Sequence, residues 1–145
     1  MTVTEAPTLE VFSLRSQLLS SGRQDRILTE TDDLWLTMKV YASGGENNLH
    51  RHPTEDHAFV VLSGQATFYD RDENPTVVNP FEGAMLPKGA FYHFCSSADE
   101  PLVMLRVGAG VKATRLSPDG SVAMPRDDPS AKVPTIPIPG KFFPE

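Results

Sequence analysis

The sequence predicts a single all-β domain, and three observations support this. Thirteen prolines and ten glycines in 145 residues separate short apolar runs, a pattern typical of closely spaced strands and turns. Residues 34–41 (LWLTMKVY) alternate two sets of side chains with a period of two, as a strand does. A hydrophobic content of 39% is enough for one core, so we expect one domain.

The segment ahead of this strand, residues 1–33, is expected to form an N-terminal arm. Leu14, Leu18 and Leu19 fall at helix-like spacing, and Ser20-Ser21-Gly22 then ends the pattern. This spacing predicts one short helix in the arm.

Further strand candidates follow, with turn-forming residues between most of them. The Ser63-Gly64 pair predicts a hairpin that joins FVVL to ATFY, which favours antiparallel pairing. Short antiparallel strands leave two architectures open, a sandwich and a closed barrel or jelly roll. The candidates lie at residues 48–52, 57–62, 65–69, 76–78, 83–86, 92–96 and 102–107.

The C-terminal segment, residues 111–145, is rich in proline, aspartate and glycine, which favours extended structure. Its apolar side chains need a surface to pack on, so we expect the segment to cross the barrel or a partner subunit. These side chains are Val133, Ile136, Ile138, Phe142 and Phe143.

Composition and charge exclude several classes of partner. The net charge is −6, from 19 acidic and 13 basic residues, and no run of lysine and arginine suits a nucleic-acid backbone. No apolar stretch approaches the length of about 20 residues that a membrane helix needs. With one cysteine, Cys95, and no signal-peptide pattern, we expect a cytoplasmic protein whose partner is a small molecule.

Three of the four histidines fall within eight residues, and they are the main chemical signal. His50 and His52, two apart on a strand, point to the same face and can reach one ion. The loop 54–56 is expected to reverse the chain, so that His57 opens the neighbouring strand and presents a third nitrogen. Three such ligands leave open positions for water or substrate.

Two stretches resemble the motifs of the cupin superfamily. In the first, Gly44 is followed by His50-x-His52, His57 and Gly64 at the family's spacing, with His57 where the usual glutamate stands. In the second, Pro87-x-Gly89 is followed after two residues by Tyr92, at the position of the usual histidine ligand. The resemblance covers residues 34–107. It implies a cupin double-stranded β-helix, a jelly-roll barrel with its core at residues 34–110.

The same register bears on the fourth ligand position. Phe94 and the stretch 98–102 (ADEPL) continue the family pattern without a gap, which turns Tyr92 inward and His93 outward. His93 remains the alternative ligand, reached by a slip of one residue. Glu55 is the alternative carboxylate, and the simpler interpretation of it is a solvated loop residue or a side chain that supports the ligands.

The resemblance further implies a metal-dependent enzyme for a small oxygenated organic substrate. Three-histidine iron cupins make a dioxygenase, an oxidoreductase with Fe(II), the first hypothesis, and zinc, manganese, nickel and copper are alternative metals. In this hypothesis Tyr92 is catalytic, by orienting substrate or moving a proton. Two other classes stay open: a non-catalytic metal-binding or small-molecule-binding cupin, and an isomerase, lyase or decarboxylase. A homodimer is also expected from the family.

Four further residues are candidates for contact with substrate. Phe59, Phe94 and Met104 are expected to form apolar walls. Arg106 shares a strand face with Met104, and if that face is the barrel interior it can clamp a carboxylate. The alternative for Arg106 is a surface salt bridge.

Overall fold

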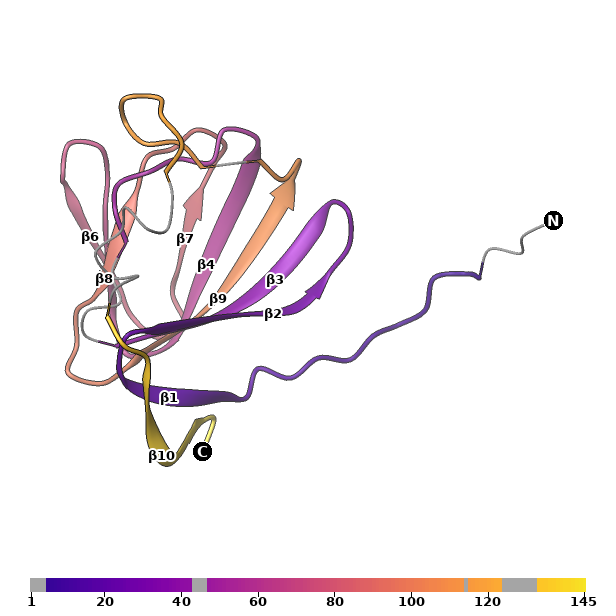
Figure 1. Cartoon of the computed structure of the whole chain (residues 1–145), viewed down its shortest axis with the longest axis vertical. Coiled ribbons are helices and arrows are strands. Elements are labelled where there is room, and N and C mark those ends of the chain that lie inside the picture. The colour runs from indigo at the N-terminus through magenta and orange to yellow at the C-terminus, as the bar shows by residue number, and fades with distance from the viewer. Residues whose placement is uncertain (1–4, 43–46, 114, 124–132) are drawn as a thin grey trace.

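The computed structural model describes residues 5–42, 47–113, 115–123 and 133–145. These residues form strands and no helix, so the described part holds no helix that could span a membrane (Figure 1). The strands are β1 Ser16–Ser21, β2 Arg23–Glu30, β3 Leu34–Tyr41, β4 Glu55–Ser63, β5 Ala66–Tyr69, β6 Pro75–Val78, β7 Gly83–Leu86, β8 His93–Ser96, β9 Leu102–Gly110 and β10 Ile136–Phe143.

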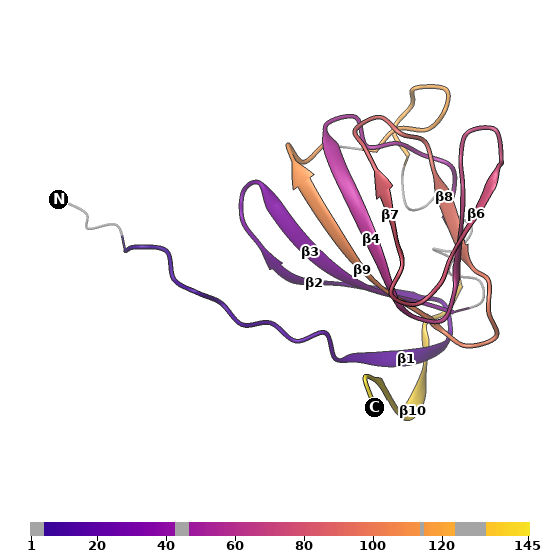
Figure 2. The same cartoon turned by 180° about the vertical axis from the view of Figure 1, so that it is seen from behind.

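Two antiparallel sheets face each other and make the barrel. One has the strand order β2-β3-β9-β4-β7 and the other has the order β6-β5-β8. A third, two-stranded sheet of β1 and β10 lies beneath the barrel in both views, and the N-terminal arm runs away from it (Figures 1 and 2). The expected all-β jelly-roll fold is confirmed, with β2 from the predicted arm paired with β3 from Trp35 to Tyr41.

Strand β3 is buried on both of its faces. Its odd-numbered side chains face the barrel interior, where Thr37 and Lys39 line cavities. Its even-numbered side chains Met38 and Val40 face outward and are packed against Leu19 of β1. The sheet of β1 and β10 therefore covers apolar side chains that a barrel without it would expose to solvent.

An aromatic core closes one part of the barrel interior. The rings of Phe59, Phe68 and Phe94 lie with their centroids 5.2 to 5.9 Å apart, in tilted and edge-on arrangements that favour aromatic packing. Tyr92 joins this cluster, with its ring centroid 5.7 Å from that of Phe59. Packing in this core therefore holds the Tyr92 ring in place and limits the directions in which its hydroxyl can point.

The predicted N-terminal helix is wrong, because this segment is strand β1 followed by β2. Strand β1 pairs with β10, and Gln17 Nε2 donates to the carbonyls of Ile138 (2.7 Å) and Lys141 (2.8 Å). These partners lie more than 120 residues away in the sequence, so the local spacing of the leucines could not reveal them.

The predicted hairpin at Ser63-Gly64 is also wrong. Strand β4 pairs with β7 and β9, whereas β5 pairs with β6 and β8, so the turn carries the chain from one sheet to the other. Gly64 has a φ of 79°, and a Cβ there would lie 2.6 Å from the carbonyl oxygen of Pro101. A crossing chain, and not a partner strand, thus occupies the space beside the turn.

Two other segments differ from a simple strand pattern. In residues 48–52 only His50 and Arg51 form isolated bridges, the first with Tyr92 and the second with Leu116. The C-terminal segment packs on its own chain, because β10 pairs with β1 and Phe143 contacts the Leu19 cluster.

Candidate metal centre

Strand register brings the histidine segment and Tyr92 to one place. His50 and Tyr92 exchange both backbone hydrogen bonds, at 3.1 and 2.9 Å, so their side chains lie side by side with ring centroids 4.5 Å apart. His57 lies on β4 opposite Gly108 of β9. The rings of His52 and His57 are stacked, with centroids 4.1 Å apart.

Glu55 is a central member of this cluster. The chain turns at Pro53 and Thr54, and β4 already begins at Glu55, so the predicted loop 54–56 is shorter than expected. Glu55 is only 6% exposed, which contradicts its interpretation as a solvated loop residue. Its Oε1 accepts from His57 Nε2 (3.1 Å) and its Oε2 from the backbone N–H of Ala113 (3.0 Å).

These residues fit a metal ion. His52, Glu55 and His57 each offer a ligand atom, and these atoms lie within 4.8 Å of one another. In the described part of the chain, the Nδ1 atoms of His52 and His57 are buried and have no hydrogen-bond partner. A buried polar atom without a partner is costly, and an ion would satisfy it. Two imidazoles and a carboxylate are donors common to many divalent metals.

The imidazoles are held in the neutral state that a metal ligand requires. Burial lowers the pKa of His50 to about 4 and, helped by the neighbouring histidines, that of His52 to about 2. Burial also lowers the pKa of His57, and the hydrogen bond that His57 donates to Glu55 opposes this shift. Each ring therefore keeps a lone pair at neutral pH.

His50 lies at the edge of the group. Its Nδ1–H donates to the carbonyl of Asn48 (2.6 Å), which leaves Nε2 as the acceptor. Its ring meets that of His52 edge-on, with centroids 5.0 Å apart. The arrangement of His52, Glu55 and His57 is thus the tighter set, and the role of His50 as a ligand stays a prediction.

Tyr92 faces the cluster and His93 faces away from it. The Tyr92 hydroxyl lies 3.2 Å from His52 Nε2, and the side chain is 3% exposed. Burial raises the pKa of Tyr92, so its phenol keeps its proton. His93 Nε2 instead donates to Glu73 (2.9 Å), and its ring stacks on Tyr69. These positions agree with the alternation expected from the sequence.

Two cavities adjoin the cluster. One, of about 330 Å³, reaches Trp35, Glu55 and His57, and the other, of about 240 Å³, reaches His50 and Tyr92. Arg106 lines both and donates through Nη2 to Thr37 Oγ1 (3.3 Å), which contradicts its interpretation as a surface salt bridge.

The three predicted wall residues lie elsewhere. Phe59, Phe94 and Met104 are buried in the aromatic core, and none of them is among the residues that line these two cavities.

Sequence reasoning missed several residues of the site. Trp35 packs edge-on against His57, with centroids 6.4 Å apart, and Lys39 lines the smaller cavity with Asp25. The available signal was that Thr37 and Lys39 lie at alternate positions of β3, between apolar residues. Such a strand suits a barrel with a polar interior. Arg115, in the irregular segment after β9, gave no such signal.

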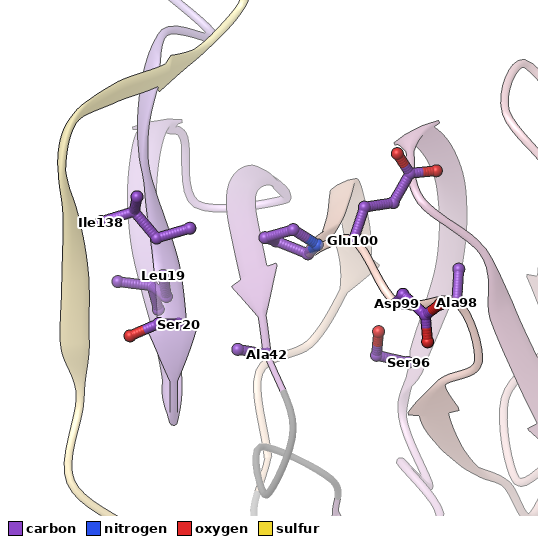
Figure 3. A pocket seen from close by; sticks show the side chains of 9 residues that line it. Leu19, Ser20, Ala42, Ser96, Ala98, Asp99, Glu100 and Ile138 are labelled. Carbon is purple, nitrogen blue, oxygen red and sulfur yellow. The ribbon is translucent and has the colours of Figure 1, made fainter.

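A further cavity lies away from the histidines. It has a volume of about 460 Å³ and is formed by β1, β10 and the turn before β9 (Figure 3). Leu19 and Ile138 stand on one side of it and Ala98 and Asp99 on the other. Its lining residues include no histidine, so we assign the chemistry to the two smaller cavities.

Comparison with known proteins agrees with this geometry. The family model for the cupin domain matches residues 37–108. The protein YdbB of Bacillus subtilis (strain 168) is 28% identical over 65 residues, which is 45% of this chain. The match spans 56% of the length of that relative.

Solved structures show the same fold. A protein with a double-stranded β-helix domain from Klebsiella pneumoniae superposes with a TM-score of 0.60 at 21% identity, over 71% of this chain and 85% of that one. The DMSP lyase DddQ from Ruegeria pomeroyi gives a TM-score of 0.58 at 19% identity, over 70% of this chain and 54% of that one. With the motif residues, the family match and the barrel in agreement, this chain holds a small cupin-type domain.

Proposed function

We propose that this cupin is a metal-dependent enzyme for a small oxygenated organic molecule, with an Fe(II) dioxygenase reaction as the first candidate. The observation that carries the proposal is the group of His52, Glu55 and His57, with two buried ring nitrogens that have no hydrogen-bond partner. Two histidines and one carboxylate form the ligand set that non-haem Fe(II) oxygenases use. The position of Glu55 therefore strengthens the dioxygenase hypothesis, which the sequence based on histidines alone.

A bound divalent ion supplies Lewis acidity and, as Fe(II), redox chemistry with dioxygen. His52, His57 and Glu55 would hold the ion, and His50 is the candidate for a further position. The backbone N–H of Ala113 holds the second oxygen of Glu55, so the carboxylate cannot rotate freely. The protein side of the site is thereby organised before substrate arrives.

Tyr92 would act on the substrate as a proton donor. Its neutral phenol is held in place by the aromatic core, with Oη within hydrogen-bond distance of His52. A buried phenol whose pKa is raised donates a hydrogen bond but does not act as a base at neutral pH. We therefore assign Tyr92 to orienting an oxygen of the substrate or giving it a proton.

Elemental analysis of the purified protein tests the metal site. One divalent ion per chain is expected, and His52→Ala and Glu55→Gln should each weaken metal affinity by at least about tenfold. His93→Ala is the matched control, because His93 lies on the outer face, and it should keep the wild-type metal content. A His52→Ala protein that retains its metal refutes the site.

Metal replacement then tests the reaction class. The dioxygenase proposal predicts that Fe(II), added without oxygen to the metal-free protein, binds stoichiometrically and supports oxygen uptake with substrate. Activity with zinc in place of iron would instead assign a Lewis-acid isomerase, lyase or decarboxylase. A protein that never holds stoichiometric metal would favour acid–base chemistry by Tyr92 and a histidine.

A further inference from the structure

The cavity beside His50 collects positive charge. It has a volume of about 240 Å³, which is the share of about eight water molecules in the liquid. Among the described residues that line it, four side chains are cationic and one is a carboxylate, although the chain as a whole has a net charge of −6. The cations are Arg23, Lys39, Arg106 and Arg115, and the carboxylate is Asp25.

The carboxylate of Asp25 already has a partner. Asp25 lies opposite Lys39 in the β2–β3 register, and Lys39 Nζ donates to Asp25 Oδ1 at 2.5 Å. This pair accounts for one of the four cations. Arg106 from β9 and Arg115 from the segment after β9 therefore give the described lining of the cavity an excess of positive charge.

Arg106 is the cation best placed to meet a ligand. Its Nε is buried without a hydrogen-bond partner, and its Nη2 makes one hydrogen bond of 3.3 Å to Thr37. In the described ranges of the chain no carboxylate lies within salt-bridge distance of it. A guanidinium offers five donors in a fork that matches a carboxylate, so most of this fork remains for a ligand.

The cationic cavity also reaches the candidate metal centre. His52, Arg106 and Arg115 line both cavities, so one ligand can contact the guanidinium of Arg106 and the imidazole of His52 together. We propose that the substrate is a small organic acid whose carboxylate is bound by Arg106 and its neighbouring cations in this cavity. The proposal rests on the function proposed above and names the class of its substrate.

Calorimetric binding of succinate, with neutral succinamide as the comparison, tests this proposal. The full chain is used as purified, with the metal content measured on the same sample. Succinate should bind more tightly than succinamide, and the preference should shrink as ionic strength rises. Arg106→Gln should weaken succinate binding about 10- to 100-fold, because a charge-assisted bidentate contact is lost. Equal binding of the two probes by the wild type overturns the proposal.

Matched variants separate the causes of any loss. Lys141→Gln removes the same charge from an exposed site on β10 and should leave succinate binding unchanged. Arg106→Lys keeps the charge but loses the fork, and should lie between wild type and Arg106→Gln. If Arg106→Gln does not fold, by circular dichroism, Arg115→Gln takes its place with the same expected loss.

The failure of this inference is distinguishable from failure of the proposed function. Wild-type protein from which the metal has been removed should keep its preference for succinate over succinamide. Succinate binding that disappears with the metal and is unchanged in Arg106→Gln would place the anion on the ion and overturn the cationic cavity. If metal-free wild-type protein still prefers succinate, this result supports carboxylate binding in the cationic cavity, whether or not the metal site is confirmed.

Discussion

Replacing Gly108 by alanine tests how Trp35 is placed beside the candidate metal centre. A Cβ at Gly108 would lie 2.0 Å from Nε1 of Trp35, 2.3 Å from its Cε2 and 2.8 Å from its Cδ1. Because carbon atoms pack at about 3.5–4 Å, the indole must move by more than about 1 Å. Such overpacking costs about 1–3 kcal/mol, which lowers the melting temperature by about 3–10 °C in a domain of this size.

The assay uses the single tryptophan of the chain. In Gly108→Ala, urea unfolding should have an earlier midpoint, and the emission of folded Trp35 should shift as the indole leaves its buried position. Because Trp35 packs edge-on against His57, metal retention should fall as well.

The double variant with Trp35→Phe is the control for this prediction. Phenylalanine lacks Nε1, so the two substitutions should be non-additive, with a coupling energy of at least about 1 kcal/mol. A Gly108→Ala protein with wild-type stability and emission would refute the close approach of Trp35 to β9.

Three other predictions follow from the same structure. Tyr92→Phe should destabilise the protein by about 1 kcal/mol in urea unfolding, because the hydroxyl partner of His52 is lost. In the metal-free protein, the pKa of His50 is about 4 when folded and about 6.5 when unfolded. Between these values the unfolded state holds more protons, so stability should fall with decreasing pH, by up to about 1.4 kcal/mol per unit; a flat urea midpoint from pH 6.5 to 4.5 would contradict this. Leu9 and Val11 are 86% and 85% exposed on the protruding arm, so light scattering should give the mass of a homodimer, and Leu9→Asp with Val11→Asp should give that of a monomer.

The barrel strands were predictable where the pattern was local. The ranges 34–41 and 83–86 coincide with β3 and β7, because alternation and flanking turns mark both ends of these strands. Segment 16–21 was not predictable, because its strand conformation depends on β10, near the other end of the chain. The hairpin predicted at Gly64 was wrong for a similar reason, because distant partners decide which sheet each strand joins.

The site was predictable in its histidines but not in its charges. Clustering and spacing brought His50, His52 and His57 forward, and the structure places all three rings together. Glu55 could not be assigned, because its burial depends on a hydrogen bond from Ala113, 58 residues later. Of the cations, the sequence brought forward Arg106 alone, with two interpretations that only the direction of its strand face could separate.

The charged interior and the terminal sheet are linked through β3. Its polar side chains face the cavities, so its apolar ones must face outward, where Met38 and Val40 would meet solvent without β1 and β10. Burying each of these side chains contributes about 1.5–3 kcal/mol, which offsets the desolvation of Lys39 among the arginines. Because β1 and β10 lie outside the matched cupin region 37–108, segments beyond that region stabilise the strand on which this charged cavity is built.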